Sequence, residues 1–422
     1  MREMKDSGIE WIGKVPVEWK IDNPQYHFSQ RKDRAKRGMV QLTASQKYGV
    51  ITQTEYMERT GANIVTVQKD FDILKLVCAG DFVIHMRSFQ GGLEYSEKTG
   101  SISSAYVMLI PSDTIREPRY YKWFFKSSNY IDALSSTSNL VRDGQAMRWS
   151  NFVQLPILFP TAEEQQRIAD FLDTKCAEID ALTADIQAQI DTLEQYKKSI
   201  ITETVTKGLN PDVEMTDSGI QWIGNMPAHW DVIRGKYILR YMQKPVREDD
   251  GVITCFRDGE VTLRSNRRED GFTMSDKEIG YQGIDVGDLV VHGMDGFAGS
   301  IGISDSRGKA SPVLNVLDTD QCKRYIMYYL RSMAYSDVFL AMATGIRVRS
   351  CDLRWNKLAE LFYPVPPLDE QNAIVEYIDS VLSKVDAVIA DKKAQLETLD
   401  KYKKSLIFEY VTGKKEVSEG AD

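Results

Sequence analysis

Two stretches of sequence decide the fold: LDTKCAEIDAL at Leu172–Leu182 and IDSVLSKVDAV at Ile378–Val388. From the first stretch onward an apolar residue returns every seven positions, and the second stretch begins the same pattern in the other half of the chain. A seven-residue apolar repeat sustained over several turns is typical of a coiled-coil helix rather than of an ordinary surface helix. Each stretch therefore predicts a long helix with one apolar stripe.

The two stripes are expected to pack against each other in antiparallel orientation, because similar helices that carry the same stripe are natural partners. Lys392 interrupts the second stripe, and Gln189 and Gln395 are polar positions of the kind that fix helix register. The alternative is that each helix packs on its own globular domain. The residues predicted at the helix-pair interface are Leu172, Ile179, Leu182, Ile186, Leu193, Tyr196, Ile200, Ile378, Val385, Val388, Leu399, Tyr402 and Leu406.

Further motifs repeat in the same order, with a period near 207 residues. SGIEWIGKVPVEWKI at Ser7–Ile21 returns as SGIQWIGNMPAHWDV at Ser218–Val232. AGDFVIH at Ala79–His85 returns as VGDLVVH at Val286–His292. This period is far too long for one unit of a solenoid. The chain is therefore interpreted as two copies of one module, each a globular part followed by a helix.

We predict an α+β fold with a pseudo-twofold internal repeat, in which two mixed α/β domains are separated by two long antiparallel coiled-coil helices. Prolines precede and glycines follow both helical stretches, as is usual at helix ends. The runs that favour strands are Asp81–Met86, Ala105–Ile110, Asp288–His292 and Pro312–Leu317. Arg119–Phe125 and Lys323–Met333 are expected to be short, aromatic-rich core helices. The predicted parts are domains at 1–158 and 209–364, helices at 159–208 and 365–413, and a disordered tail at 414–422.

The composition is not that of a membrane or secreted protein, and its acidic residues are concentrated in two segments. The 422 residues carry a net charge of −8, which argues against an indiscriminate polyanion binder. Residues 161–208 hold 10 acidic and 5 basic side chains, and residues 366–413 hold 9 and 6, so the excess lies in the helices. No apolar run reaches the roughly 18 residues of a membrane span, and no signal-peptide core is visible. Five cysteines without a C-x-x-C pair complete the expectation of a cytoplasmic protein.

The motifs that usually indicate catalysis are missing or incomplete. The four histidines are isolated, so no metal site is predicted. GISDSRGKA at 302–310 lacks a glycine and a hydroxyl of the phosphate-binding loop and is expected to form a turn. DNPQY at 22–26 lacks one proline of the [DN]-P-P-[YF] motif of amino-methyltransferases, and no glycine-rich cofactor loop accompanies it. We predict a non-catalytic chain that holds neither metal nor cofactor.

Basic loops recur in both globular parts, outside the acidic helices. Arg, Lys, Gln and Asn can reach base edges in the major groove of DNA, whereas acidic helices are repelled by phosphate. For any single patch, a merely solvated surface is the alternative interpretation. The residues predicted to contact DNA are Arg34, Lys36, Arg37, Arg87, Gln90, Gln145 and Arg148 in the first module, and Arg264, Asn266, Arg267, Arg268, Arg347 and Arg349 in the second.

The repeated motifs resemble those of the specificity subunit of type I restriction-modification systems over essentially the whole chain. The resemblance rests on the two SGI-x-WIG openings, the GDFVI and GDLVV strands, and two proline-EQ helix starts, LPILFPTAEEQQRIADFLD and YPVPPLDEQNAIVEYID. The helices end in YKKSIITETVTKG and YKKSLIFEYVTGK. Each motif alone is weak, but all of them occurring twice and in order form a specific signature.

The resemblance implies that the globular parts are target-recognition domains, each reading one half of a bipartite, asymmetric DNA sequence. It implies that the helices set the spacing and that two methyltransferase subunits dock on the chain. S-adenosylmethionine, and ATP with Mg²⁺, are then expected in those methyltransferase subunits and in restriction subunits. Two rival hypotheses are a coiled-coil adaptor that does not bind DNA and a self-contained modification enzyme with an unrecognised active site.

Overall fold

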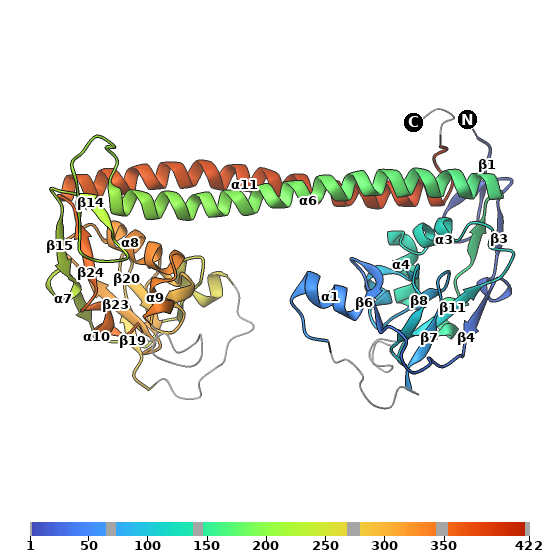
Figure 1. The fold of residues 1–422 in the computed structure, drawn as a ribbon, viewed down its shortest axis with the longest axis horizontal. Coiled ribbons are helices and arrows are strands. Elements are labelled where there is room, and N and C mark those ends of the chain that lie inside the picture. Colours follow the sequence, from blue (N-terminus) through green and yellow to red (C-terminus); the bar gives the residue numbers. More distant parts are fainter. Residues whose placement is uncertain (1, 65–72, 138–146, 268–278, 343–352, 418–422) are drawn as a thin grey trace. The chain divides into compact units, whose positions relative to one another are not determined.

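The computed structural model describes residues 2–64, 73–137, 147–267, 279–342 and 353–417 (Figure 1). The chain divides into two compact units. The first unit consists of Met1–Ile186 and Ala394–Asp422, and the second of Gln187–Lys393. Two long helices, α6 (Ala162–Lys207) and α11 (Leu368–Val411), each contribute one segment to both units. Each unit is described by itself.

The first unit is built on the four-stranded antiparallel sheet β4-β11-β8-β9. Aromatic rings of β4, β8, α3 and α5 form its core, where Phe28 lies 5.4–6.1 Å from the rings of Phe82, Tyr121, Phe125 and Phe152. Its strands are β1 (Met4–Asp6), β2 (Lys14–Pro16), β3 (Lys20–Asp22), β4 (Phe28–Arg31), β5 (Leu42–Ser45), β6 (Gly49–Thr52), β7 (Lys75–Val77), β8 (Phe82–Ile84), β9 (Glu94–Tyr95), β10 (Gly100–Ile102), β11 (Val107–Pro111) and β12 (Ile157–Phe159). Its short helices are η1 (Pro24–Tyr26), α1 (Gln53–Thr60), α2 (Ser88–Gly91), α3 (Pro118–Phe124), α4 (Ser128–Ser136) and α5 (Trp149–Phe152).

The second unit repeats this plan with the antiparallel sheet β16-β23-β20-β21. Its strands are β13 (Met215–Asp217), β14 (Asn225–Pro227), β15 (Asp231–Arg234), β16 (Arg240–Met242), β17 (Ile253–Cys255), β18 (Val261–Leu263), β19 (Gln282–Ile284), β20 (Leu289–His292), β21 (Ile301–Ile303), β22 (Gly308–Ala310), β23 (Leu314–Asp318) and β24 (Phe362–Val365). Its short helices are α7 (Gly235–Ile238), η3 (Arg264–Asn266), η4 (Gly296–Ala298), α8 (Lys323–Tyr335), α9 (Val338–Ala341) and α10 (Trp355–Leu358). The α+β fold with an internal repeat is confirmed.

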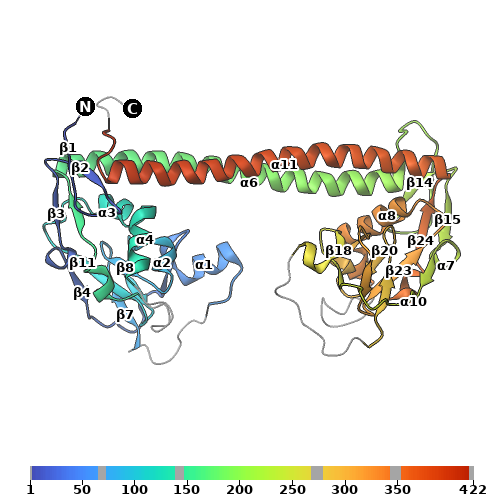
Figure 2. The ribbon, with the colours of Figure 1, turned by 180° about the vertical axis from the view of Figure 1, so that it is seen from behind.

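In each unit an aromatic helix lies between the sheet and the long helices, α3 in the first and α8 in the second (Figures 1 and 2). The Tyr120 hydroxyl donates to the Val411 carbonyl at 2.7 Å, and the equivalent Tyr325 donates to Val205 at 3.1 Å. All four of these residues are buried. The expectation that the two aromatic segments are core helices is therefore confirmed.

Segments of α6 and α11 pair in antiparallel orientation within each unit. In the first unit Lys403 donates to Asp180 at 2.5 Å, while the rings of Phe171 and Tyr410 are 4.4 Å apart. In the second unit Lys197 donates to Asp386 at 2.6 Å, and Lys392 reaches the Gln189 side chain. Both segments also join the core of the globular part of their unit. Within each unit the helices thus pair with each other and also pack on the globular part. The predicted pairing is found, and so is the helix–domain packing that was considered as its alternative.

The predicted interface is wrong for Leu182, Tyr196, Val388 and Tyr402, whose exposed fractions are 48%, 46%, 45% and 55%. The other predicted residues are buried or half-buried, namely Leu172, Ile179, Ile186, Leu193, Ile200, Ile378, Val385, Leu399 and Leu406. The second buried row follows the first by four residues rather than three, as in Leu172 to Cys176 and Ile186 to Ile190. Polar residues such as Thr183 and Lys197 occupy other positions of that second row. The distribution of apolar residues alone therefore predicted the wrong second row for the helix-pair interface.

The predicted disordered tail is also wrong for its first residues. The Lys414 ammonium reaches the carbonyl of Ile12, and Lys415 pairs with Glu409 at 2.7 Å. Residues 418–422 lie outside the described residues. Among the helices that the structure describes, none combines the length and the apolar character that crossing a bilayer requires.

Candidate nucleic-acid interface

The repeated Gly-Asp turn before β8 and β20 anchors the frame of each domain. In the first unit Asp81 is buried, and it accepts two hydrogen bonds from Arg31, at 2.7 and 2.8 Å. It also accepts the backbone N–H of Cys78 at 2.8 Å. In the second unit Asp288 has the same role, since it accepts from Lys244 at 2.7 Å and from the Asp285 backbone at 2.8 Å. The GDFVI and GDLVV motifs therefore have a structural function.

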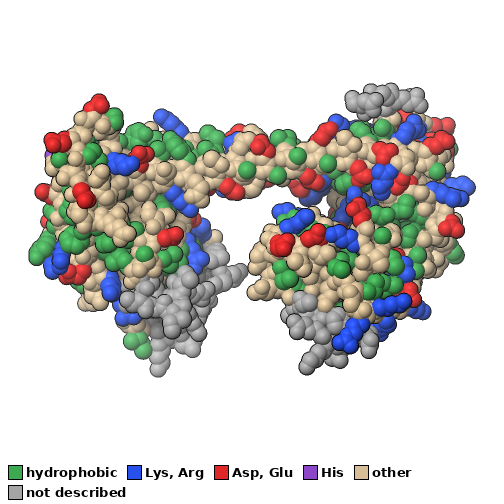
Figure 3. Space-filling model, viewed as in Figure 1, with side chains coloured by type: hydrophobic (Ala, Val, Ile, Leu, Met, Phe, Trp, Pro, Cys, Tyr) green, Lys and Arg blue, Asp and Glu red, His purple; other side chains and the backbone are tan. Residues whose placement is uncertain are grey.

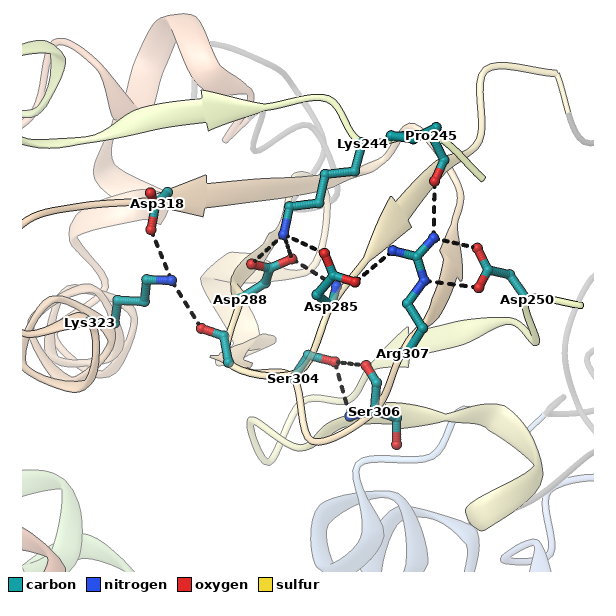
Figure 4. Close-up of polar contacts among 11 residues, drawn as sticks. Lys244, Pro245, Asp250, Asp285, Asp288, Ser304, Ser306, Arg307, Asp318 and Lys323 are labelled. Carbon is teal, nitrogen blue, oxygen red and sulfur yellow. Dashed lines mark hydrogen bonds and ion pairs between the residues drawn. The ribbon is translucent and has the colours of Figure 1, made fainter. Parts of the chain in front are cut away.

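In the second unit this anchor belongs to a larger network (Figure 4). Lys244 lies between the carboxylates of Asp285 and Asp288, and Arg307 lies between Asp285 and Asp250. Hydrogen bonds from Lys244 and then from Arg307 lower the pKa of Asp285 to about 2. Arg307 belongs to the segment that resembles a phosphate loop. Its guanidinium is committed to these carboxylates, so the segment holds the frame together instead.

The predicted DNA-contacting residues of the first unit lie on its exposed surface. Arg34, Lys36 and Arg37 lie between β4 and β5, where Arg34 donates to the Ile73 carbonyl at 3.0 Å. Arg87 and Gln90 share the loop and short helix after β8, and Arg148 precedes α5. The structure brings Arg87 and Gln90 together on one loop, and Figure 3 shows Lys and Arg side chains gathered on the lower part of this unit. Gln145 lies outside the described residues.

The predicted residues of the second unit follow β18. Arg264 donates to the Thr254 hydroxyl at 3.4 Å, and Asn266 donates to the Thr262 hydroxyl at 2.9 Å. Arg267 donates to Asp258 at 2.6 Å and to Glu260 at 3.0 Å, so its charge is already neutralised within the protein. Arg268, Arg347 and Arg349 lie outside the described residues.

Arg264 and Arg267 line a cavity of about 690 Å³ in the second unit. Arg257, Thr254, His292 and Ser311 also line it, and the buried Ser300 hydroxyl at its wall has no hydrogen-bond partner. Guanidinium and hydroxyl groups around an open hollow can bind an acceptor-rich partner such as a base edge or a phosphate. The hollow lies between the β17–β18 hairpin and the loop after β20.

Comparison with known proteins finds relatives of one kind. Residues 27–192 match the model of the type I restriction modification DNA specificity domain. The MjaVIII type I restriction enzyme specificity subunit of Methanocaldococcus jannaschii is 22% identical over 418 residues, which are 95% of this chain and 94% of that protein. The protein named as the MjaX specificity subunit of the same organism is 24% identical over 322 residues, 73% of this chain and 70% of that protein. The chain is thus similar to type I specificity subunits over nearly its whole length.

A solved structure supports the fold of this chain. A chain from work on complex assembly and conformational transition of the type I R-M system has a TM-score of 0.65 and 13% sequence identity, and it covers 94% of this chain and 99% of that chain. The resemblance inferred from the repeated motifs is confirmed, and the family model covers most of the first globular part. Among the described residues, no cluster of three or more His, Cys, Asp or Glu side chains could hold a metal ion.

Sequence reasoning missed Arg59 and Gln46 of the candidate surface. In the first domain Arg59 and Lys47 lie over the Tyr48 ring, at 5.3 and 5.1 Å from its centroid, and Gln46 contacts the Arg87 carbonyl at 2.9 Å. In the second domain the position equivalent to Gln46 is Arg257. Aligning the β5–β6 and β17–β18 hairpins of the two copies would have revealed this pair of positions.

Proposed function

We propose that each target-recognition domain reads one half of a bipartite, asymmetric DNA site. The observation that carries this proposal is that the two domains share a frame but differ at its surface. Asp81 and Asp288 anchor the same turn, whereas Gln46 is replaced by Arg257 at the equivalent hairpin position. Different side chains at equivalent positions read different bases. Two such domains therefore favour two unlike half-sites.

Within each proposed surface, side chains differ in how free they are to read bases. Arginine recognises guanine through O6 and N7, and glutamine recognises adenine through N6 and N7. Arg87 and Gln90 are exposed on one loop and suit this role. Arg267 suits this role less, because it would have to leave two carboxylates. The other proposed contacts are Arg34, Lys36, Arg37, Gln145 and Arg148 for the first half-site, and Asn266, Arg268, Arg347 and Arg349 for the second.

We further propose that two methyltransferase subunits dock on the long helices. The side chains that were wrongly placed in the helix-pair interface are exposed at equivalent positions of the two copies: Leu182 and Tyr402 in the first unit, and Val388 and Tyr196 in the second. Exposed apolar groups at the same place in both copies suit two copies of one partner. The spacing between half-sites is then set by the length of α6 and α11.

The chemistry of the complex is assigned to its partners. S-adenosylmethionine would be bound by the methyltransferase subunits, and ATP with Mg²⁺ would be used by restriction subunits. In this proposal the specificity subunit supplies base recognition and positions the other chains in the cytoplasm, and it is not itself catalytic.

Selection from random DNA duplexes by the purified complex of this chain with its methyltransferase partner tests the proposal. Enrichment of one split, non-palindromic sequence is expected. The absence of any enriched sequence would favour a coiled-coil adaptor that does not bind DNA. DNA methylation by this chain alone with S-adenosylmethionine would favour a self-contained enzyme.

A further inference from the structure

A histidine at the end of the same strand caps the next loop in both recognition domains. His85 follows β8 directly, and its Nδ1 accepts the backbone N–H of Arg87 at 3.3 Å. His292 ends β20, and its Nδ1 accepts the backbone N–H groups of Met294 at 3.2 Å and Asp295 at 3.0 Å. An imidazole nitrogen accepts a hydrogen bond only when it carries no proton, so both rings must be neutral with the proton on Nε2.

The capped loop in turn holds the neighbouring hairpin. In the first domain the Arg87 carbonyl accepts a hydrogen bond of 2.9 Å from Gln46 in the β5–β6 hairpin. In the second domain the Asp295 carboxylate accepts one of 3.1 Å from Arg257 in the β17–β18 hairpin. The histidine is the same in both copies, whereas the groups that it holds differ. A constant residue beneath variable ones is the arrangement expected of a support for a reading surface.

We propose that His85 and His292 are positioning residues, which in their neutral form hold the loop and hairpin of each recognition domain in the DNA-reading arrangement. This inference rests on the proposed function of the domains. It assigns the two histidines a shared role, and it predicts that recognition depends on pH.

Protonation would add an N–H at Nδ1, facing the backbone N–H groups from which Nδ1 now accepts hydrogen bonds. Two donors would then face each other, and the cap would open. The charged groups around the two rings differ. In the first domain the Glu94 carboxylate lies 3.6 Å from His85 Nε2 and is paired with Lys126. In the second domain Asp295 and Arg257 lie near His292, and Asp258, Arg264 and Arg267 line the same cavity.

The balance around His292 favours the neutral ring. Burial lowers the pKa of His292 below its usual 6.5, with a further contribution from Arg257 that Asp295 opposes. The unfolded or open loop therefore binds a proton more readily than the capped loop. The cap is fully effective above about pH 6.5 and is lost as the pH falls below that value. The pH dependence of recognition should therefore be measured at the second half-site.

Three variants of the chain in complex with its methyltransferase partner test the proposal. His292→Ala removes the acceptor, His292→Gln moves it to the place of Nε2, and His292→Asn keeps an acceptor oxygen near the place of Nδ1 but cannot titrate. At about pH 7.5, Ala and Gln should reduce enrichment of the second half-site about tenfold and leave the first half-site unchanged. Asn should retain recognition at every pH tested, whereas the wild type should lose recognition of the second half-site progressively as the pH falls below about 6.5.

Hydrogen exchange of the segment from His292 to Ser300 separates the two ways in which the account can fail. If the wild type selects no DNA sequence, the proposed function fails. Faster exchange in Ala and Gln but not in Asn would still establish the cap. If the wild type selects a split sequence and His292→Ala selects it equally well with unchanged exchange, the positioning role is overturned.

Discussion

Lys197 on α6 donates a hydrogen bond of 2.6 Å to Asp386 on α11, and this contact has an equivalent in Lys403 and Asp180 at 2.5 Å. Each pair lies within one compact unit. Lys197 corresponds to Lys403 in the repeated YKKS motif, and Asp386 corresponds to Asp180. The duplication therefore extends to individual ion pairs, each formed between the two helices rather than within one of them.

Reversing the charge of Lys197 should weaken the helix pairing in the second unit. Lys197→Asp places a carboxylate beside Asp386 and should lower the free energy of unfolding by about 0.5–1 kcal/mol, because the pair is partly exposed. Adding Asp386→Lys should restore most of the loss. Urea unfolding measures both effects. Lys207→Asp is a control, because Lys207 pairs within its own helix with Glu203. A double variant no more stable than the single one would show that the contact contributes nothing.

The two exposed apolar pairs predict how many partner subunits bind. Changing Leu182 and Tyr402 to serine should leave one methyltransferase subunit bound instead of two, because the equivalent pair in the second unit is untouched. Changing Tyr196 and Val388 should have the same effect. Native mass spectrometry of the complex counts the subunits. Tyr237→Ser is a control on an exposed residue outside α6 and α11. Retention of two subunits after both double changes would contradict docking at these pairs.

Arg264 and Arg267 make a matched comparison in the second domain. Arg264→Ala should reduce discrimination at the second half-site by about 1–3 kcal/mol, as expected for loss of a base contact. Arg267→Ala should change recognition less, because its guanidinium pairs with Asp258 and Glu260. Binding to duplexes that vary at one position at a time measures both. An equal loss for every sequence would instead mark a phosphate contact.

The network around Asp285 predicts acid sensitivity of the second unit. Lys244 and Arg307 hold the pKa of Asp285 at about 2, against an ordinary value of 3.8. The unfolded chain binds more protons between these values, so this contribution to stability is full above about pH 4 and is lost as the pH falls through about 2. Asp285→Asn should reduce the dependence of stability on pH in this window. Unfolding by urea across the window measures it, and an unchanged slope would contradict the assignment.

The repeat made much of the fold predictable, because local periodicity and chain-end signals specify helices directly. The four misplaced residues, Leu182, Tyr196, Val388 and Tyr402, show the limit of this approach. Apolar content does not reveal which side of a helix faces its partner when polar residues occupy part of the buried row. Pseudo-symmetric pairs such as Asp180 with Lys403 determine that side, and they lie far apart in the sequence.

The candidate site was less predictable than the fold for a related reason. Whether an arginine is free to read DNA depends on carboxylates that sequence proximity does not indicate. Arg31 belongs to the basic run before β5, yet it is bound to Asp81. Arg267 was predicted to read bases, but it is paired with Asp258. Strand β18 separates these two residues in the sequence. The equivalence of Gln46 and Arg257 follows from the strand register of the two hairpins, which the sequence alone does not give.

Exchange of one recognition domain for a copy of the other tests the central claim most directly. In a chain whose residues 209–364 are replaced by residues 1–158, both readers are the same. Selection from random duplexes by this chain with its methyltransferase partner should give a site with two copies of the first half-site. The account would be contradicted if this chain still selected the original second half-site. It would also be contradicted if the complex assembled but showed no sequence preference at the second half-site.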